Sequence, residues 1–159
     1  MNEYSSSLEK WARSSISKTL VSVVARLYVD GSKIEQLPYH AIHLQFDEGP
    51  PGFIDCAPDG SSLFCNSEKL RPIAMGEAGE LVLQDVSADK YLGAVVGSRL
   101  SKVWIIHSKR DSIDIGVKLR FHNDVEIILA NLGDELLVCD AISEELVQDE
   151  SLVCRPLAL

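Results

Sequence analysis

The chain has 159 residues, of which 46% are hydrophobic and 25% are charged, and its formal net charge is −9 at pH 7. This length and composition are typical of one soluble globular domain, whose core is large enough to need no disulfide or metal. No apolar run reaches the ~20 residues of a membrane helix, and the negative charge disfavours direct binding to nucleic acid, which needs basic groups over the phosphates.

Two features of the sequence bear on cellular location. The first residues, MNEYSSSLEKWARSS, lack the basic and apolar regions of a secretory signal. The four cysteines have no CxxC spacing, which in a reducing compartment favours buried thiols over a disulfide framework or a metal site. We therefore expect a cytoplasmic protein without a cofactor.

The N-terminal half of the chain predicts one helix followed by strands. Residues from Ser5 to about Ser17 form an amphipathic pattern that one of the first three serines can cap. From Leu20 onward β-branched residues dominate, which predicts a strand that ends at the turn Asp30-Gly31. Further strands are expected over 40–46, 53–57, 62–65 and 80–86, a linker over 66–79, and one or two helical turns over 89–96.

The clearest pattern lies between Ser112 and Cys139. Apolar and polar residues alternate from Ile113 to Phe121, which is typical of a strand with one buried face. Turn-forming residues follow at 122–124 and 131–134, and each turn leads into another apolar run. The stretch is best interpreted as a meander, preceded by a strand over 100–107 and followed by a short helix capped by Ser143 and an edge strand near 152–155.

An internal repeat relates the two halves. The aligned positions are Leu20 with Leu100, Phe46 with Phe121, and Cys65 with Cys139, displaced by 80, 75 and 74 residues (100 − 20, 121 − 46, 139 − 65). One such unit cannot bury its apolar face alone, whereas two packed units can. We predict a single domain over 1–159 of the α+β, β-rich class. It is expected to be mainly antiparallel sheet from two pseudo-repeated three-strand units (roughly 20–65 and 100–139), with a short N-terminal helix and one or two short helices.

Side chains that perform catalysis or bind metals in other proteins occur here without a supporting motif. His40 and His43 would face opposite sides of a strand, so a metal site would need His107, His122 and a carboxylate such as Asp124. Cys56 or Cys139 as a nucleophile would need a histidine base close in space. Carboxylate pairs such as Asp111/Asp114 and Asp124/Glu126 are best interpreted as a solvated strand face. The chain contains no GxGxxG, P-loop or GxSxG motif, and we predict no catalytic and no metal-binding residue.

Most of the excess negative charge lies near the C-terminal end. Between residues 134 and 150 there are seven acidic residues and no lysine or arginine. A solvated helix and loop is one interpretation; a docking surface for a basic partner is the other. On the second interpretation the predicted partner-binding residues are Asp134, Glu135, Asp140, Glu144, Glu145, Asp149 and Glu150.

Two segments carry a resemblance to a known class of proteins. Gly116-Val-Lys-Leu-Arg-Phe-His-Asn-Asp124 and Leu132-Gly-Asp-Glu-Leu-Leu-Val138 are similar to strand and turn segments of small bacterial families. The chain resembles the immunity proteins of bacterial polymorphic-toxin and contact-dependent growth-inhibition systems. The resemblance implies a non-enzymatic protein that binds the C-terminal domain of a cognate toxin, commonly a basic nuclease, and occludes its active site; it implies no residue-level site.

Two alternatives remain open at this point. One is a small ligand-binding or enzymatic β-domain with a cleft between the repeats, near His107 and His122. The other is a structural adaptor or oligomeric subunit that buries an apolar strand edge between chains. The sequence leaves the oligomeric state unknown.

Overall fold

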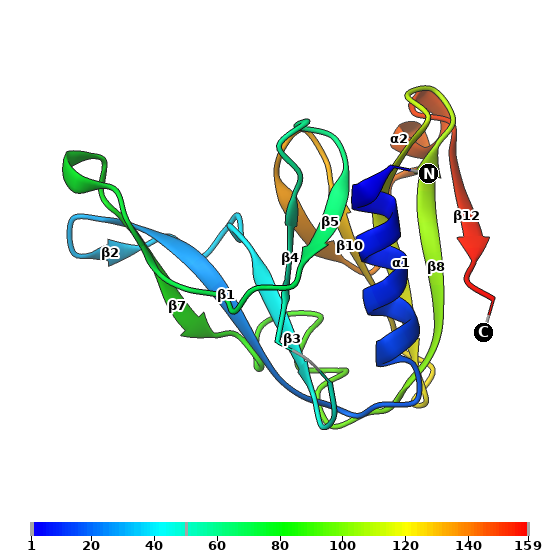
Figure 1. Ribbon diagram of the computed structural model, residues 1–159, viewed down its shortest axis with the longest axis horizontal. Helices are drawn as coiled ribbons and strands as arrows, with labels where there is room; N and C mark the ends of the chain where they lie inside the picture. Colours follow the sequence, from blue (N-terminus) through cyan, green and yellow to red (C-terminus); the bar gives the residue numbers. More distant parts are fainter. Residues whose placement is uncertain (1, 50, 159) are drawn as a thin grey trace.

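The computed structural model describes residues 2–49 and 51–158, which form two antiparallel sheets and a helix packed against both (Figure 1). The helix is α1 (Glu3–Ser15). The first sheet has the order β5 (Leu63–Asn66), β4 (Phe53–Cys56), β3 (Ile42–Phe46), β1 (Leu20–Asp30), β7 (Glu80–Asp85), β6 (Ile73–Ala74), with β2 (Lys33–Ile34) also paired to β1. The second has the order β11 (Leu136–Cys139), β10 (Glu126–Asn131), β9 (Ile113–Phe121), β8 (Leu100–Ser108), β12 (Leu152–Pro156). The predicted β-rich α+β class is confirmed.

Each sheet contains a meander of four strands, one more than the predicted unit. The first meander is β1, β3, β4 and β5, and the second is β8, β9, β10 and β11. Both begin with the same irregularity, because the register shifts after the first cross-strand pair. The pairs on either side of the shift are Leu20 with Phe46 and Ser22 with Gln45 in the first meander, and Leu100 with Phe121 and Lys102 with Arg120 in the second. Each meander therefore has a β-bulge at the same place, and the bulge bends the first strand of each meander in the same way.

The two meanders are joined by reciprocal backbone hydrogen bonds at their starts. The amide of Ser17 donates to the carbonyl of Leu100 at 2.8 Å, and the amide of Gly97 donates to the carbonyl of Leu20 at 2.7 Å. Between these bonds, Thr19 and Arg99 form an antiparallel bridge with each other. The two donors (97 − 17), the two acceptors (100 − 20) and the two bridge partners (99 − 19) are each separated by 80 residues in the sequence. A pseudo-twofold axis therefore passes through the Thr19–Arg99 pair.

The main core lies between the two sheets and is closed on one side by α1. Leu8 and Ala12 of the helix are fully buried in it. The helix starts earlier than predicted, because the side chain of Asn2, and not a serine, accepts the capping hydrogen bond from the amide of Ser5 at 2.9 Å. The side chain of Ser7 accepts a hydrogen bond from the backbone amide of Cys65 at 3.2 Å, so α1 also covers the edge of β5.

The meanders diverge in their later strands. Ile54 of β4 faces the main core, whereas Ile128 of β10 faces a second apolar cluster on the outer side of the second sheet. Ile142 and Leu152 pack over this cluster, beside the short helix α2 (Glu144–Asp149). Cys139 packs there too, while Cys65 faces the helix α1, so the aligned cysteines are not equivalent in orientation.

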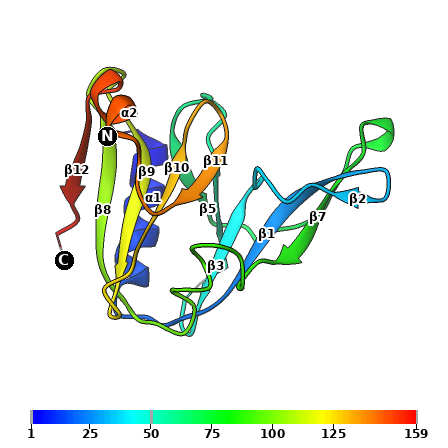
Figure 2. The ribbon, with the colours of Figure 1, turned by 180° about the vertical axis from the view of Figure 1, so that it is seen from behind.

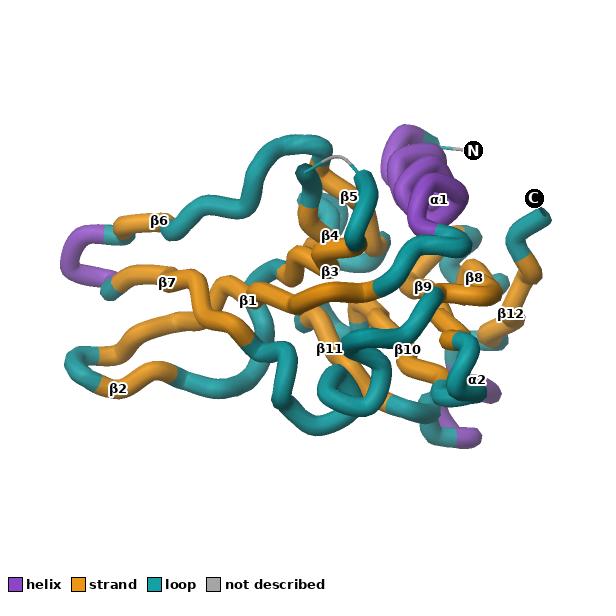
Figure 3. Tube along the Cα trace, turned by 90° about the horizontal axis from the view of Figure 1, so that it is seen from below, coloured by secondary structure: helices purple, strands orange, loops and turns teal. Residues whose placement is uncertain are grey.

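The first sheet continues into an arm that projects from the body (Figures 1 and 3). We define the arm as residues 26–38 and 71–85, which include β2, β6, β7 and the one-turn helix η1 (Gly76–Ala78). The predicted linker 66–79 is therefore partly structured, since it contains β6 and η1. Arg26 of β1 holds the segment that leads into β6. Its guanidinium donates to the carbonyl oxygens of His40 and Arg71 at 3.2 and 3.3 Å and lies over the ring of Phe53.

Neither α1 nor α2 has the length and apolar character to cross a membrane, and the described ranges 2–49 and 51–158 contain no other helix that does.

Candidate functional site

The turns at the ends of two hairpins, one from each meander, lie side by side (Figures 1 and 2). The buried side chain of Asn131, at the end of β10, links them. Its amide nitrogen donates to the carbonyl of Ser62 in the β4–β5 turn at 3.0 Å, and its oxygen accepts from the backbone amide of Asp134 at 3.0 Å. Because Asn131 and Ser62 are almost fully buried, the two turns are held in one fixed arrangement.

Each turn is also ordered by its own local hydrogen bonds. In the first, the carboxylate of Asp59 accepts bonds from the Ser61 amide, the Ser62 amide and the Ser62 hydroxyl at 2.9, 2.8 and 2.6 Å. Burial acts to raise the pKa of Asp59, but the bonds from Ser62 and Ser61 outweigh it and hold the pKa below its usual value. In the second, Asp134 follows Gly133 with a left-handed backbone, a conformation that aspartate tolerates better than most residues.

Acidic side chains of the two turns act on one another electrostatically. Burial raises the pKa of the Cys56 thiol, and the negative charges of Asp55, Asp134, Asp59 and Glu135 contribute in the same direction, to a value of about 12. These acids come from both meanders, so carboxylates of both turns lie near the Cys56 thiol. We call Asp55, Asp59, Asp134 and Glu135 the tip cluster.

The seven predicted partner-binding residues fall into separate groups. Asp134 and Glu135 belong to the tip cluster, and both are exposed. Asp140 is exposed just after β11, and the other four lie on or directly after α2: Glu144, Glu145, Asp149 and Glu150. Glu150 is partly neutralised, since its carboxylate pairs with the guanidinium of Arg110 at 2.7 Å.

Sequence reasoning missed two members of the tip cluster, Asp55 and Asp59. They lie far from the acidic run in the chain and reach it only through the pairing of the two turns. The internal repeat contained the signal, because it aligns the β4–β5 hairpin with the β10–β11 hairpin. Part of the charge on Asp55 is offset by Arg26, whose guanidinium lies 3.5 Å from the carboxylate.

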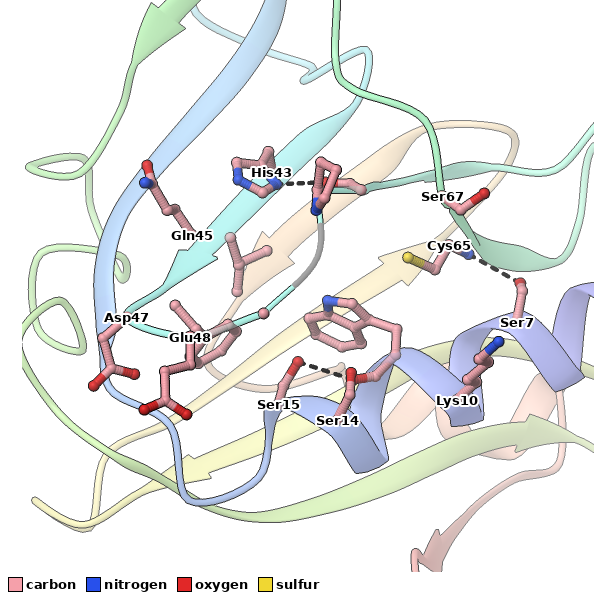
Figure 4. A pocket seen from close by; sticks show the side chains of 16 residues that line it. Ser7, Lys10, Ser14, Ser15, His43, Gln45, Asp47, Glu48, Cys65 and Ser67 are labelled. Carbon is pink, nitrogen blue, oxygen red and sulfur yellow. Dashed lines mark hydrogen bonds between the residues drawn. The ribbon is translucent and has the colours of Figure 1, made fainter.

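A groove of about 760 Å³ lies between α1 and β3 (Figure 4). Lys10 and Trp11 of the helix line one side, and His43 of β3 lines the other. The His43 ring is tied to the backbone, since its Nδ1 donates to the carbonyl of Gly52. Burial raises the pKa of the Cys65 thiol in the groove to about 11, so the thiol is protonated at neutral pH and is not an activated nucleophile.

A second hollow of about 610 Å³ adjoins a cluster of buried charges. His107 Nδ1 is 2.8 Å from a carboxylate oxygen of Asp114, and Arg155 lies between the carboxylates of Asp114 and Glu9 at 3.7 and 2.9 Å. Arg155 thereby ties β12 to both β9 and α1. Both buried carboxylates therefore have cationic partners, and removing Arg155 would leave buried charge uncompensated.

The structure does not bring together the histidines and cysteines that the sequence analysis considered for a metal site or a nucleophile. His107 pairs with the start of β9, whereas His122 follows its end, so the predicted cleft near both histidines does not form. Burial raises the pKa of Cys56 and of Cys139, the two candidate nucleophiles. Within 2–49 and 51–158, no group of three or more histidine, cysteine or carboxylate side chains is arranged to hold a metal ion.

Comparisons of the chain with family models, curated proteins and solved structures found no match.

Proposed function

We propose that this chain is a non-enzymatic immunity protein. It acts in the bacterial cytoplasm by binding the C-terminal domain of a cognate toxin, a basic nuclease, and occluding its active site. The tip cluster provides the contact, with the acids of α2 beside it. The charge distribution is the observation that carries this proposal.

Two segments of the chain account for its whole formal net charge of −9, because the rest of the chain has equal numbers of acidic and basic residues. Residues 53–66 and 131–150 contain nine acidic residues and no lysine or arginine. The remainder has 15 acidic residues (24 − 9) and 15 basic residues, and is therefore balanced. These two segments form the β4–β5 hairpin, the turn after β10, β11 and α2, so the excess negative charge lies on these elements.

The order of the turns also supports tight binding. The tip cluster is held by the Asn131 bonds and by the Asp59 turn, so little conformational freedom is lost when a partner docks. Complementary charge raises association rates by a factor of ~10 to 10³ and suppresses wrong partners. A rigid acidic surface fits the substrate groove of a nuclease, which is lined by groups that bind phosphate.

The test uses the C-terminal domain of the candidate toxin, which we expect to be encoded directly upstream of this chain. The association rate is measured for the wild type and for the variant Asp134→Asn/Glu135→Lys. Asparagine preserves the left-handed backbone at position 134. We expect a rate roughly tenfold lower in the variant, and a weaker dependence of that rate on salt between about 0.05 and 0.5 M.

The matched control is Asp124→Asn/Glu68→Lys, which changes the net charge by the same amount. Asp124 also has a left-handed backbone, but it lies in the β9–β10 turn, and Glu68 is exposed after β5. The control should bind at nearly the wild-type rate. Equal losses in both variants would mean that only overall charge matters, and no binding by the wild type would overturn the proposal.

A further inference from the structure

Three basic side chains gather around Trp104 on the outer face of the second sheet. The residues on either side of Trp104 in β8 are buried in the main core, so its own side chain points to the outer side. On β9, the Lys118 ammonium lies over the indole ring, 4.5 Å from its centroid, and the Arg120 guanidinium lies at 5.5 Å. Lys102 shares this face, because it is the cross-strand partner of Arg120. We call Lys102, Trp104, Lys118 and Arg120 the basic patch.

The pseudo-symmetry of the scaffold does not account for the charge of this patch. In the second meander, the cross-strand pairs are Lys102 with Arg120 and Trp104 with Lys118. The first meander has the same register at the equivalent place, where the paired residues are Ser22 with Gln45 and Val24 with His43. These equivalent positions contain no lysine, arginine or tryptophan. The basic patch is therefore a feature of the second meander alone.

Most of the positive charge of the patch has no counter-charge. Arg120 forms an ion pair with Glu126 at 3.1 Å. In the ranges 2–49 and 51–158, no carboxylate forms an ion pair with Lys102 or Lys118. Lys102 is exposed, and the contact with the indole ring keeps Lys118 in place. The patch thus offers two free positive charges to a partner, and one of them is already ordered.

The opposite charge lies on the same face of the sheet, next to the patch. Ile106 and Ile128, which adjoin the patch along β8 and across from β9, belong to the second apolar cluster. The segments on both sides of α2 pack on this cluster, so α2 stands over that end of the face (Figure 2). The exposed side chains of α2 include the acids Glu144 and Glu145 and the apolar Val147.

The two charged regions are self-complementary under a twofold rotation. They follow one another along β8 and β9, on one face. When two copies bring these faces together about an axis that runs across the strands, the strand direction reverses, and α2 of each copy meets the basic patch of the other. Each copy then uses both of its regions, so the pair is closed. A long polyanion such as nucleic acid fits less well, because it would continue from the patch over the acids of α2.

We propose that the outer face of the second sheet binds a second copy of this chain and forms a twofold-symmetric dimer, with α2 of each copy on the basic patch of the other. Charge complementarity specifies the partner. Trp104 and Val147, which is 37% exposed, add apolar contact. Neither region belongs to the tip cluster, and the test below needs no toxin, so this proposal stands or fails separately from the proposed function.

The oligomeric state of the full chain tests the dimer directly. Sedimentation equilibrium from about 1 to 100 µM should give twice the mass of one chain in the upper range, no larger species, and dissociation on dilution. Raising the salt from about 0.05 to 0.5 M should weaken the dimer. Lys102→Glu/Lys118→Glu and Glu144→Lys/Glu145→Lys should each weaken it roughly tenfold or more, because like charges then face each other in both contacts.

Mixing these two variants tests which regions meet. In a mixed pair, the native α2 of the first variant faces the native patch of the second, and the reversed patch faces the reversed α2. The mixture should therefore dimerise like the wild type although neither variant does so alone. All four substitutions in one chain should also restore the dimer.

The matched control is Lys33→Glu/Lys69→Glu, which changes the net charge as the first variant does. Both lysines are exposed, on β2 and after β5, away from the basic patch. The control should dimerise nearly as the wild type does, and circular dichroism verifies the fold of every variant. A wild type that stays monomeric, species larger than a dimer, equal weakening by the control, or a mixture that stays monomeric overturns the proposal.

Discussion

The two meanders begin alike and end differently. Their first two strands share a β-bulge and a register, and they exchange equivalent backbone hydrogen bonds across the pseudo-twofold axis. Their outer parts share little: the first sheet extends into the arm, and the second carries α2 over its outer face. The similar parts therefore build the scaffold, and the surfaces that we assign to binding lie where the meanders diverge or where their turns meet.

The equivalent pair Phe46 and Phe121 gives the sharpest stability test of this comparison. Phe121 is fully buried in the main core, whereas Phe46 is half-buried beside Trp11. Phe121→Ala should lower the free energy of unfolding by ~3–5 kcal/mol, the usual cost of removing a buried ring. Phe46→Ala should cost about half as much, because the removed side chain already contacts water.

Urea unfolding of both variants measures the difference. Similar losses would mean that the two positions are energetically equivalent despite the difference in their burial.

Asn131 is the place where the two hairpin turns depend on each other. Asn131→Ala leaves the buried Ser62 carbonyl with one partner fewer and the Asp134 amide with none from this side chain, so it should cost ~1–3 kcal/mol. Asn123→Ala is the matched control. The side chain of Asn123, in the β9–β10 turn, makes comparable bonds to Ala94 before β8 and to Val125, but these bonds are exposed, and the cost should stay below ~1 kcal/mol.

Thermal or urea unfolding compares the two asparagine variants. A larger loss for Asn123→Ala would show that Asn131 is not what holds the turns together.

The smallest effect concerns the titration of Cys56. Its folded pKa, about 12, lies above the ordinary thiol value of 9.0, so the fold favours the protonated form. This contribution to stability is present below pH 9.0 and is lost as the pH rises between the two values. Asp134→Asn with Glu135→Gln should lower the pKa of Cys56, because both carboxylates oppose ionisation of the thiol.

Alkylation rates at alkaline pH, in a protein with Cys56 as its only cysteine, report this shift. The neutralised variant should react faster than the parent at the same pH. An unchanged rate would mean that the second turn does not act on the thiol of the first.

Local patterns in the sequence predicted most strands well. Alternation from Ile113 to Phe121 predicted β9 with its bounds, although both faces of its first half are buried, since Asp114 to Val117 are all buried. Pairing over long distances was harder. The outer half of β1 joins β7, more than 50 residues later, and nothing in either local pattern specifies that pairing or the arm that results.

Only half of the tip cluster could be predicted from the sequence, because the other half joins it through a contact between distant segments. Asp134 and Glu135 belong to a run of like charge that a single sequence displays, whereas Asp55 lies between apolar residues of β4. Its place in the tip cluster depends on the Asn131–Ser62 bond, a contact across 69 residues. The start of α1 was misplaced because three serines resemble a cap as well as Asn2 does.

The bridge between Thr19 and Arg99 has an evolutionary consequence. Residues on a pseudo-symmetry axis contact their own counterparts, which is the arrangement that two identical half-length chains adopt about a true twofold. An ancestral homodimer of such halves would have possessed these hydrogen bonds already. Tandem fusion would then have required only a connection between the copies, after which each half was free to acquire its own appendage.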